Sequence, residues 1–225
     1  MLSKLAVMQV LTSKKAKRKS PVSKITIHHM AGMTDAAEDV AKAHATSSKD
    51  VSANYYIDNR GRIVAGVEEE FRAFTSSNRT NDDQAITIEV ANCMNKSPWE
   101  VGEKAYVALI ELCADICRRY NIVPHYDGTR DGTLTVHRQF AKTVCPGPYL
   151  FGMIENGTVE KAINQFVGLA AIPTTPQERK RPEDVAKEVI SGKWGVGADR
   201  KNRLTVAGYN YREVQKIVNN MMKGR

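Results

Sequence analysis

Residues 135–148 constrain this chain more than any other part of its sequence. They include His137 and Cys145, and a Pro-Gly-Pro run after Cys145 forces a turn beside the thiol. Two further histidines, His28 and His29, lie far upstream at the end of an apolar segment. Two histidines and one thiolate can hold a zinc ion and leave its fourth position open, which distinguishes catalytic from structural zinc. The sequence therefore predicts metal-assisted hydrolysis.

Alternation within residues 23–29 decides which histidine of the adjacent pair faces such a site. Successive side chains of a strand point to opposite faces, so Ile25 and Ile27 share one face and His28 lies on the other. We therefore expect His28, and not His29, to meet the ligands from residues 135–148.

Strand and helix patterns alternate along the first part of the chain, which predicts an α/β fold with helices packed on a sheet. We expect strands at 23–29 and 85–90, the second of them half-buried, and a hairpin from 53–57 and 62–67. We expect helices at 35–47, 98–120 and 149–167.

Composition limits the class of protein. The chain has 225 residues and an apolar share of 42%, which is ordinary for a globular protein. None of its apolar runs approaches the roughly 18–20 residues that cross a bilayer, so we expect no stable membrane insertion. The basic run at 14–19 follows the weak apolar stretch at 5–11 instead of preceding it, so we expect no secretory signal peptide.

Positive charge is concentrated at the two ends of the chain. Residues 1–24 have a net charge of +7 and residues 177–225 have +6, whereas residues 25–176 have −5. Basic ends can attract nucleic acid, an anionic membrane or an anionic cell wall, or they can serve solubility alone. Nucleic acid is not expected as a partner, because no helix-turn-helix pattern and no basic strand interleaved with aromatic residues is present.

Three prolines and the lack of apolar periodicity mark residues 171–182 as a linker. We therefore expect a catalytic domain at 1–170, with a basic N-terminal extension at 1–20, and a small second module at 183–225.

Three pieces of the first domain together resemble the type 2 N-acetylmuramoyl-L-alanine amidases. They are the run His28-His29-Met30-Ala31-Gly32, the strand Ile86-Thr87-Ile88-Glu89, and His137 followed eight residues later by Cys145-Pro146-Gly147. The resemblance covers roughly residues 20–168. It implies a central mixed sheet flanked by helices and one zinc ion in a groove. It also implies cleavage of the amide bond between N-acetylmuramic acid and the L-alanine of the peptidoglycan stem peptide.

The resemblance also assigns roles to single residues. His28, His137 and Cys145 match the zinc ligands, and Glu89 matches the glutamate that serves as general base in members with Val-Ser-Ala before the hairpin. A carboxylate near an activated water can take its proton and pass it to the leaving amine. Thr143 stands where many members have a lysine that stabilises the oxyanion. Glu89 could otherwise be an ordinary solvent-facing strand residue.

Residues 183–222 resemble the cell-wall-binding repeat of the Cpl-type phage lysins, which implies a three-helix module that binds muropeptide. The candidate wall-binding residues are Trp194, Arg200, Arg203 and Tyr211. The aromatic residues among them could instead form the core of the module.

The expected function is that of a peptidoglycan hydrolase, most simply a phage endolysin that waits in the host cytoplasm for holin-dependent release. A bacterial autolysin with the same chemistry remains an alternative. A non-catalytic peptidoglycan-binding protein on the same fold is another, although such proteins lose a metal ligand and Cys145 is present.

Overall fold

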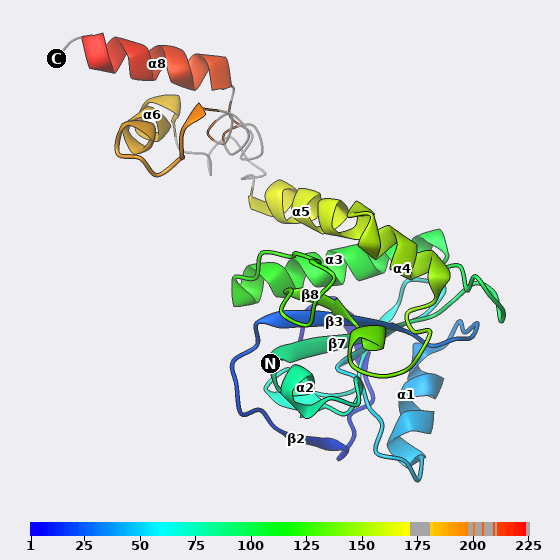
Figure 1. Ribbon diagram of the computed structural model, residues 1–225. Helices are drawn as coiled ribbons and strands as arrows, with labels where there is room; N and C mark the ends of the chain where they lie inside the picture. Colours follow the sequence, from blue (N-terminus) through cyan, green and yellow to red (C-terminus); the bar gives the residue numbers. More distant parts are fainter. Residues whose placement is uncertain (172–180, 198–199, 201–203, 205–208, 210, 224–225) are drawn as a thin grey trace. The chain divides into compact units, whose positions relative to one another are not determined.

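The computed structural model describes residues 1–171, 181–197, 200, 204, 209 and 211–223 (Figure 1). The chain folds as two compact units, Met1–Asn164 and Gln165–Arg225, and their border falls inside helix α5 (Thr158–Ala171). Most of the predicted linker, residues 171–182, lies outside the described residues. None of the helices in the described ranges is long and apolar enough to cross a membrane.

A mixed sheet forms the centre of the first unit, and six strands of it lie within the described residues (Figure 1). In spatial order they are β1 (Ala6–Gln9), β5 (Ile63–Ala65), β4 (Tyr55–Ile57), β7 (Ala85–Val90), β3 (Lys24–His29) and β8 (Leu134–Val136). Neighbouring strands run parallel, except that β4 and β5 form the antiparallel hairpin predicted from the sequence. The predicted α/β fold with a central mixed sheet is confirmed.

Helices lie on both sides of this sheet, with α3 on one side and α1 and α2 on the other (Figure 1). The helices of the unit are α1 (Ala37–Thr46), α2 (Arg79–Gln84), α3 (Glu103–Tyr120), α4 (Pro148–Glu155) and the first residues of α5, and the 3-10 helix η1 (His137–Gln139) follows β8. The predicted single helix at 149–167 is wrong. It is divided into α4 and α5 because Gly157 between them adopts a left-handed φ of +79°.

Side-chain alternation gives the sheet one polar face and one apolar face. Tyr56 of β4 is hydrogen-bonded to His44 on α1, and Thr26 of β3 accepts a hydrogen bond from Asn81 on α2. The isoleucines of β3 and β7 alternate with these polar positions, so they lie on the opposite face, where they are fully buried. The polar face is therefore the one that can hold a reactive site.

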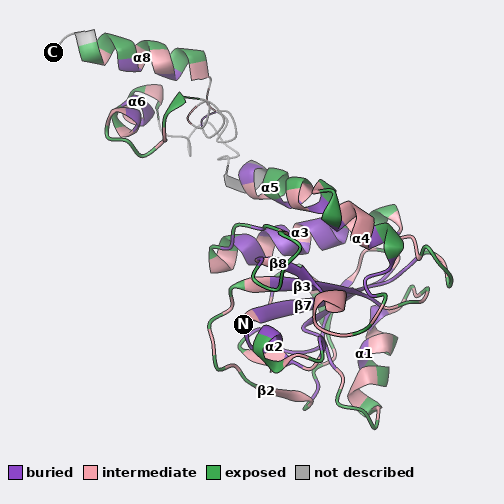
Figure 2. Cartoon of the chain, in the orientation of Figure 1, coloured by how far each residue is buried: buried purple, intermediate pink, exposed green. Residues whose placement is uncertain are grey.

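Strand β7 is more buried than its sequence pattern predicts. All six of its residues are buried (Figure 2), whereas alternation predicted a half-buried strand. The strand lies between β4 and β3 in the interior of the sheet, and both of its faces are covered. Its polar residues, Thr87 and Glu89, are therefore shielded from water and not solvent-facing.

The basic residues near the N-terminus are part of the folded unit. Strand β2 (Lys15–Lys17) pairs with β6 (Phe71–Ala73) in a small antiparallel sheet, and the Nζ atom of Lys15 lies 2.8 Å from Glu68 Oε1. The Arg18 guanidinium donates to the carbonyl oxygens of residues 82, 83 and 85 at the end of α2. Sequence patterns did not predict these two strands, because three residues are too few to establish a period.

The second unit is helical. Helices α6 (Pro182–Ile190) and α8 (Tyr211–Lys223) enclose a small apolar core. The buried residues of this core are Val185, Ala186, Val189, Leu204, Val214 and Val218. The expected helical C-terminal module is confirmed. The third helix expected for it lies outside the described residues.

Candidate active site

His28 and Glu89 form the floor of the candidate site. They are paired in register on the parallel strands β3 and β7, so both side chains lie on the polar face. His28 Nδ1 and Glu89 Oε1 are 3.9 Å apart, and the two residues are 1% and 9% exposed. The sheet alone thus brings one imidazole and one carboxylate together in a place that is nearly free of water.

His137 and Cys145 reach the same place from the segment that follows β8. His137 begins η1 directly after β8, which pairs with β3, and its ring centroid lies 4.7 Å from that of His28. The Sγ atom of Cys145 lies 3.7 Å from His28 Nδ1. One ligand atom from each of these three residues lies within 4.8 Å of the other two. Within the described part of the chain, no other group of three or more His, Cys, Asp and Glu side chains is close enough to bind a metal.

The donor atoms of this cluster fit a zinc ion. Tetrahedral zinc with bonds of 2.0–2.3 Å requires nitrogen and sulfur donors roughly 3.3–3.7 Å apart, close to the separation of Cys145 and His28. Within the cluster and beside it, His137 Nε2 and Glu89 Oε2 are buried and have no hydrogen-bond partner in the protein. Buried polar atoms normally have partners, so these two indicate that the site binds a further group.

Burial also sets the protonation states of these side chains. It lowers the pKa of His28 well below the ordinary value, with smaller contributions from His137 and His29, and it lowers the pKa of His137 as well. Both imidazoles are therefore neutral, the form that binds metals. Burial, with Glu89 nearby, raises the pKa of the Cys145 thiol, so the thiolate form requires a cation beside it.

The two adjacent histidines diverge, as strand alternation requires. The His29 ring packs edge-on against Trp99, with ring centroids 5.5 Å apart, and it lies outside the metal-binding group. Its backbone N–H donates to Cys145 Sγ over 3.4 Å. The His29 backbone N–H therefore stabilises the charge of a Cys145 thiolate.

Arg138 fixes the loop that ends at Cys145. Its guanidinium donates to the carbonyl oxygens of Val144 and Cys145, and its backbone N–H donates to the Cys145 carbonyl over 3.2 Å. The guanidinium carbon also lies 4.0 Å from the centre of the Phe151 ring. The sequence pattern did not single out Arg138, and its position next to His137 was the only available signal.

The turn after Cys145 requires a glycine at position 147 for two steric reasons. Its φ of +83° lies in the left-handed region, and a Cβ atom there would lie 3.1 Å from the His29 ring and 3.3 Å from Trp99. The Cys-Pro-Gly run therefore allows the loop to approach the end of β3 closely.

Thr143 is half-buried, two residues before Cys145. Its Oγ1 accepts a hydrogen bond from the Cys145 backbone N–H over 3.2 Å. This contact orients the hydroxyl and leaves its proton free to donate.

Two of the candidate wall-binding residues, Trp194 and Arg200, make contacts within the second unit. Trp194 Nε1 donates to Glu188 Oε2 over 3.0 Å, and its ring packs edge-on against Tyr209. Arg200 donates to the Gly195 carbonyl and to Gln215 Oε1. Arg203 lies outside the described residues.

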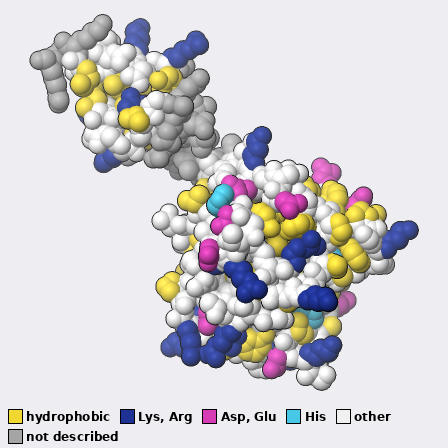
Figure 3. All heavy atoms as spheres, viewed as in Figure 1, with side chains coloured by type: hydrophobic (Ala, Val, Ile, Leu, Met, Phe, Trp, Pro, Cys, Tyr) yellow, Lys and Arg dark blue, Asp and Glu magenta, His cyan; other side chains and the backbone are white. Residues whose placement is uncertain are grey.

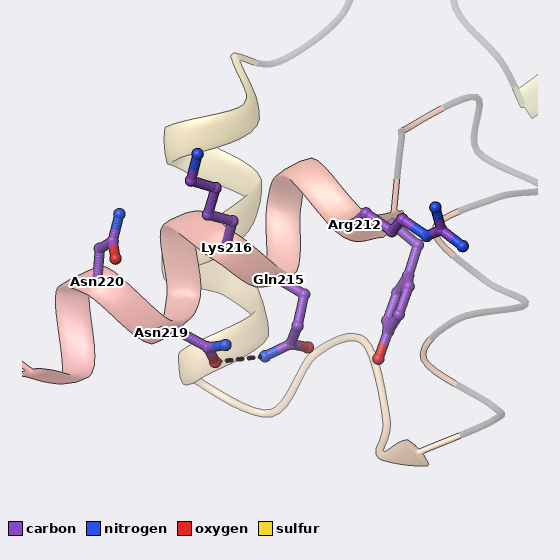
Figure 4. Close-up of a pocket in the computed structure, with 6 residues that line it drawn as sticks. Arg212, Gln215, Lys216, Asn219 and Asn220 are labelled. Atoms are coloured by element: carbon purple, nitrogen blue, oxygen red, sulfur yellow. Dashed lines mark hydrogen bonds between the residues drawn. The ribbon is translucent and has the colours of Figure 1, made fainter.

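Tyr211 lines a shallow hollow of about 400 Å³ on α8 (Figure 4). The other lining residues are polar or basic: Arg212, Gln215, Lys216, Asn219 and Asn220. Gln215 Nε2 donates to Asn219 Oδ1 over 2.9 Å along this surface. Amides, an ammonium group and an aromatic ring suit a ligand rich in hydroxyl and amide groups.

Comparison with solved structures establishes the fold. PlyL shares 20% identity with a TM-score of 0.54, over 71% of this chain and 96% of that chain. The PlyG catalytic domain shares 20% identity with a TM-score of 0.55, over 75% and 98%. The Ph2119 endolysin from the Thermus scotoductus MAT2119 bacteriophage Ph2119 shares 20% identity with a TM-score of 0.50, over 64% and 89%. No curated protein matches the chain.

Comparison with family models establishes the family. The CW_7 repeat model matches residues 183–222, within the second unit. The N-acetylmuramoyl-L-alanine amidase model matches residues 18–148, more than half of the chain, and this range includes His28, Glu89, His137 and Cys145. The chain belongs to the N-acetylmuramoyl-L-alanine amidase family.

Proposed function

We propose that this protein is a zinc-dependent N-acetylmuramoyl-L-alanine amidase in which His28, His137 and Cys145 hold the metal. The observation that supports this assignment best is the convergence of three ligand atoms within 4.8 Å from parts of the chain more than a hundred residues apart. Three protein ligands leave one position for water or substrate, which is the arrangement of catalytic zinc sites. A zinc ion held by these three residues would polarise the scissile carbonyl group and make a bound water more acidic.

Glu89 is the proposed proton carrier. Its Oε2 atom is buried without a partner, and Oε1 lies 3.9 Å from His28 Nδ1, so the carboxylate lies beside the metal ligands without being one of them. During hydrolysis, the water oxygen bonds to the carbonyl carbon and Glu89 takes the water proton. The C–N bond then breaks, and Glu89 gives its proton to the departing amine of L-alanine.

Thr143 is the proposed hydrogen-bond donor to the developing oxyanion. Its Oγ1 accepts from the Cys145 N–H, and its hydroxyl can still donate one hydrogen bond. A threonine hydroxyl is a weaker electrostatic partner than the lysine of many relatives, so more of the oxyanion stabilisation would have to come from a bound metal.

The second unit is proposed to concentrate the enzyme on the bacterial cell wall. The CW_7 repeat match and the hollow beside Tyr211 support this role. The Ph2119 endolysin comes from a bacteriophage, and its similarity favours a phage endolysin over a bacterial autolysin. We propose that the enzyme lyses the host from within, and holin-dependent release from the host cytoplasm stays a prediction.

The experiment that tests the metal site uses the full-length chain. Purified protein should contain about one zinc ion per chain by elemental analysis. Cys145→Ser and His137→Ala should lose the metal and the release of soluble wall fragments. Cys93→Ser changes an exposed thiol outside the cluster and is the matched control, which should retain both. Full lytic activity in a metal-free Cys145→Ser protein would show that the cluster is not the catalytic centre.

A further inference from the structure

The segment between His137 and Cys145 is a loop with a proposed metal ligand at each end, and Arg138 closes it. The backbone N–H and the Nε atom of Arg138 both donate to the Cys145 carbonyl, over 3.2 Å and 3.3 Å. Its Nη2 atom donates to the Val144 carbonyl. The residue next to the first ligand thus makes three hydrogen bonds to the backbone that carries the second.

Helix α4 supplies a firm surface for the Arg138 side chain. The guanidinium carbon lies over the Phe151 ring, 4.0 Å from its centre, and the Tyr126 ring packs at a right angle to Phe151 with centroids 6.3 Å apart. Leu150 and Ile154 of α4 are fully buried, so the helix is anchored in the core. Figure 3 shows hydrophobic side chains gathered on the surface around α4, with Lys and Arg side chains next to them. A planar guanidinium can lie on a ring and donate within its own plane, so Phe151 fixes the direction in which Arg138 donates.

The charge of Arg138 acts on Cys145 in the same sense as its hydrogen bonds. Burial raises the pKa of the Cys145 thiol and Glu89 adds to that rise, whereas the His29 backbone N–H and the Arg138 charge oppose it. The two opposing groups contact different atoms of Cys145, because His29 donates to Sγ and Arg138 donates to the carbonyl oxygen. Arg138 therefore favours the thiolate, which is the form that binds a metal.

We propose that Arg138 is a positioning residue that sets the loop ending at Cys145 in its metal-binding conformation before a metal binds, an inference that rests on the zinc assignment proposed above. A loop that is ordered only when the metal arrives subtracts the entropy of its ordering from the binding free energy. By closing the loop, Arg138 meets that cost during folding, so that Cys145 Sγ stays near His28 Nδ1. Arg138 acts through the Cys145 backbone and is not itself a ligand.

The first test measures metal binding in full-length protein and needs no turnover. Arg138→Gln removes the charge and the fork of donors, so the zinc dissociation constant, measured by competition with a chelator, should rise roughly 10–100-fold. With cobalt(II) in place of zinc, the thiolate-to-metal absorption band should change, because it reports how Cys145 meets the metal.

Arg130→Gln is the matched control for this measurement. Arg130 Nε also donates to a backbone carbonyl, that of Gln139, and its guanidinium carbon also lies over a ring, that of Phe140. Neither contact involves the backbone of Val144 or Cys145, so Arg130→Gln should bind zinc as wild type does. A zinc dissociation constant in Arg138→Gln within twofold of that in Arg130→Gln would overturn the proposal.

Arg138→Lys separates the charge of Arg138 from its geometry. An ammonium group keeps the charge but cannot donate to two carbonyl groups in one plane while it lies flat on Phe151. Zinc affinity should therefore recover only in part. Full recovery would show that the charge alone matters, and a positioning role for the side chain would be wrong.

Amide hydrogen exchange in metal-free protein tests the loop without the metal. The Arg138 N–H donates to the Cys145 carbonyl, and the Gly147 N–H donates to the Val144 carbonyl over 2.8 Å. Both amides should exchange about tenfold faster in Arg138→Gln than in wild type, whereas the amides of α3 should not change. Unchanged exchange at the loop, or an equal increase in α3, would contradict the proposal. If wild-type protein binds no zinc, the zinc assignment fails, and the exchange rates still decide whether Arg138 holds the loop.

Discussion

His28 and Glu89 face each other across two neighbouring parallel strands, paired in register, with His28 Nδ1 3.9 Å from Glu89 Oε1. This pairing is a property of the sheet, because any parallel partner of His28 at that register would lie on the same face. The proposed metal ligand and the proposed proton carrier are therefore positioned by backbone hydrogen bonds, and His137 and Cys145 reach them from the segment after β8.

Replacement of Glu89 tests its role as proton carrier. Glu89→Gln keeps the size of the side chain but cannot accept the proton, so turnover should fall roughly 10²–10⁴-fold. Zinc should stay bound, because Glu89 is not a member of the metal-binding group. A steady-state assay with metal analysis of the same sample checks both points. If turnover falls less than tenfold, another group transfers the proton.

The pH dependence of stability tests the burial of Glu89. Burial raises its pKa to about 8. A carboxyl group with a raised folded-state pKa favours folding fully below its unfolded pKa of about 4.3, and this contribution is lost as the pH rises to the folded pKa. In metal-free protein, Glu89→Gln should therefore have the melting temperature of wild type near pH 4 and a higher one near pH 9.

A bound cation stabilises the carboxylate, so the melting-temperature difference between Glu89→Gln and wild type should shrink when zinc is restored. Glu103→Gln, at the exposed start of α3, is the control and should show no comparable increase with pH. A Glu89→Gln difference that is flat from pH 4 to pH 9 would mean that Glu89 is well solvated in the folded protein.

Two glycines offer a matched test of the turn after Cys145. Gly147→Ala should destabilise the fold by about 1–3 kcal/mol, because φ is +83° and the new methyl group would press on His29. It should also weaken zinc binding, since the turn positions Cys145. Gly152→Ala in helix α4 meets no atom within 4 Å and should be neutral or stabilise by about 0.5–1 kcal/mol. Equal melting temperatures for the two variants would contradict this steric explanation.

Removal of the second unit tests its targeting role. A chain that ends at residue 171 should hydrolyse small soluble muropeptides normally but lose lysis of intact cells, most clearly at low enzyme concentration. The difference between the full and the shortened chain should shrink as salt is raised, because screening weakens the attraction between the basic second unit and an anionic wall. A fluorescent fusion of residues 177–225 should bind purified sacculi. Full lysis by the shortened chain, together with no binding by the fusion, would exclude a targeting role.

Sequence patterns predicted the parts of the site that local rules determine. Alternation predicted that His28 and Ile25 lie on opposite faces of their strand. The structure agrees, because residues 24–29 form the regular strand β3, in which both side chains are buried. The burial of Glu89 was not predictable from alternation, since it depends on which strands lie beside β7. Arg138 was also missed, because its contacts with the Cys145 loop depend on how that loop closes.

The fold departs from the sequence prediction where elements are short. Strands β1, β2 and β8 have three or four residues each, so their register with a distant partner determines them and their own pattern does not. Charge alone did not predict the contacts of residues 14–19. Lys15 contacts Glu68, and Arg18 donates to backbone carbonyls at the end of α2.

Mass spectrometry of digested peptidoglycan, with zinc measured in the same enzyme sample, tests the central assignment most directly. Zinc-loaded protein should release stem peptides with a free N-terminal L-alanine and leave glycan strands with intact N-acetylmuramic acid. Removal of zinc should stop both, and its return should restore them. New reducing sugar ends, cleavage within the peptides, or the same products from zinc-free protein would contradict a zinc-dependent N-acetylmuramoyl-L-alanine amidase.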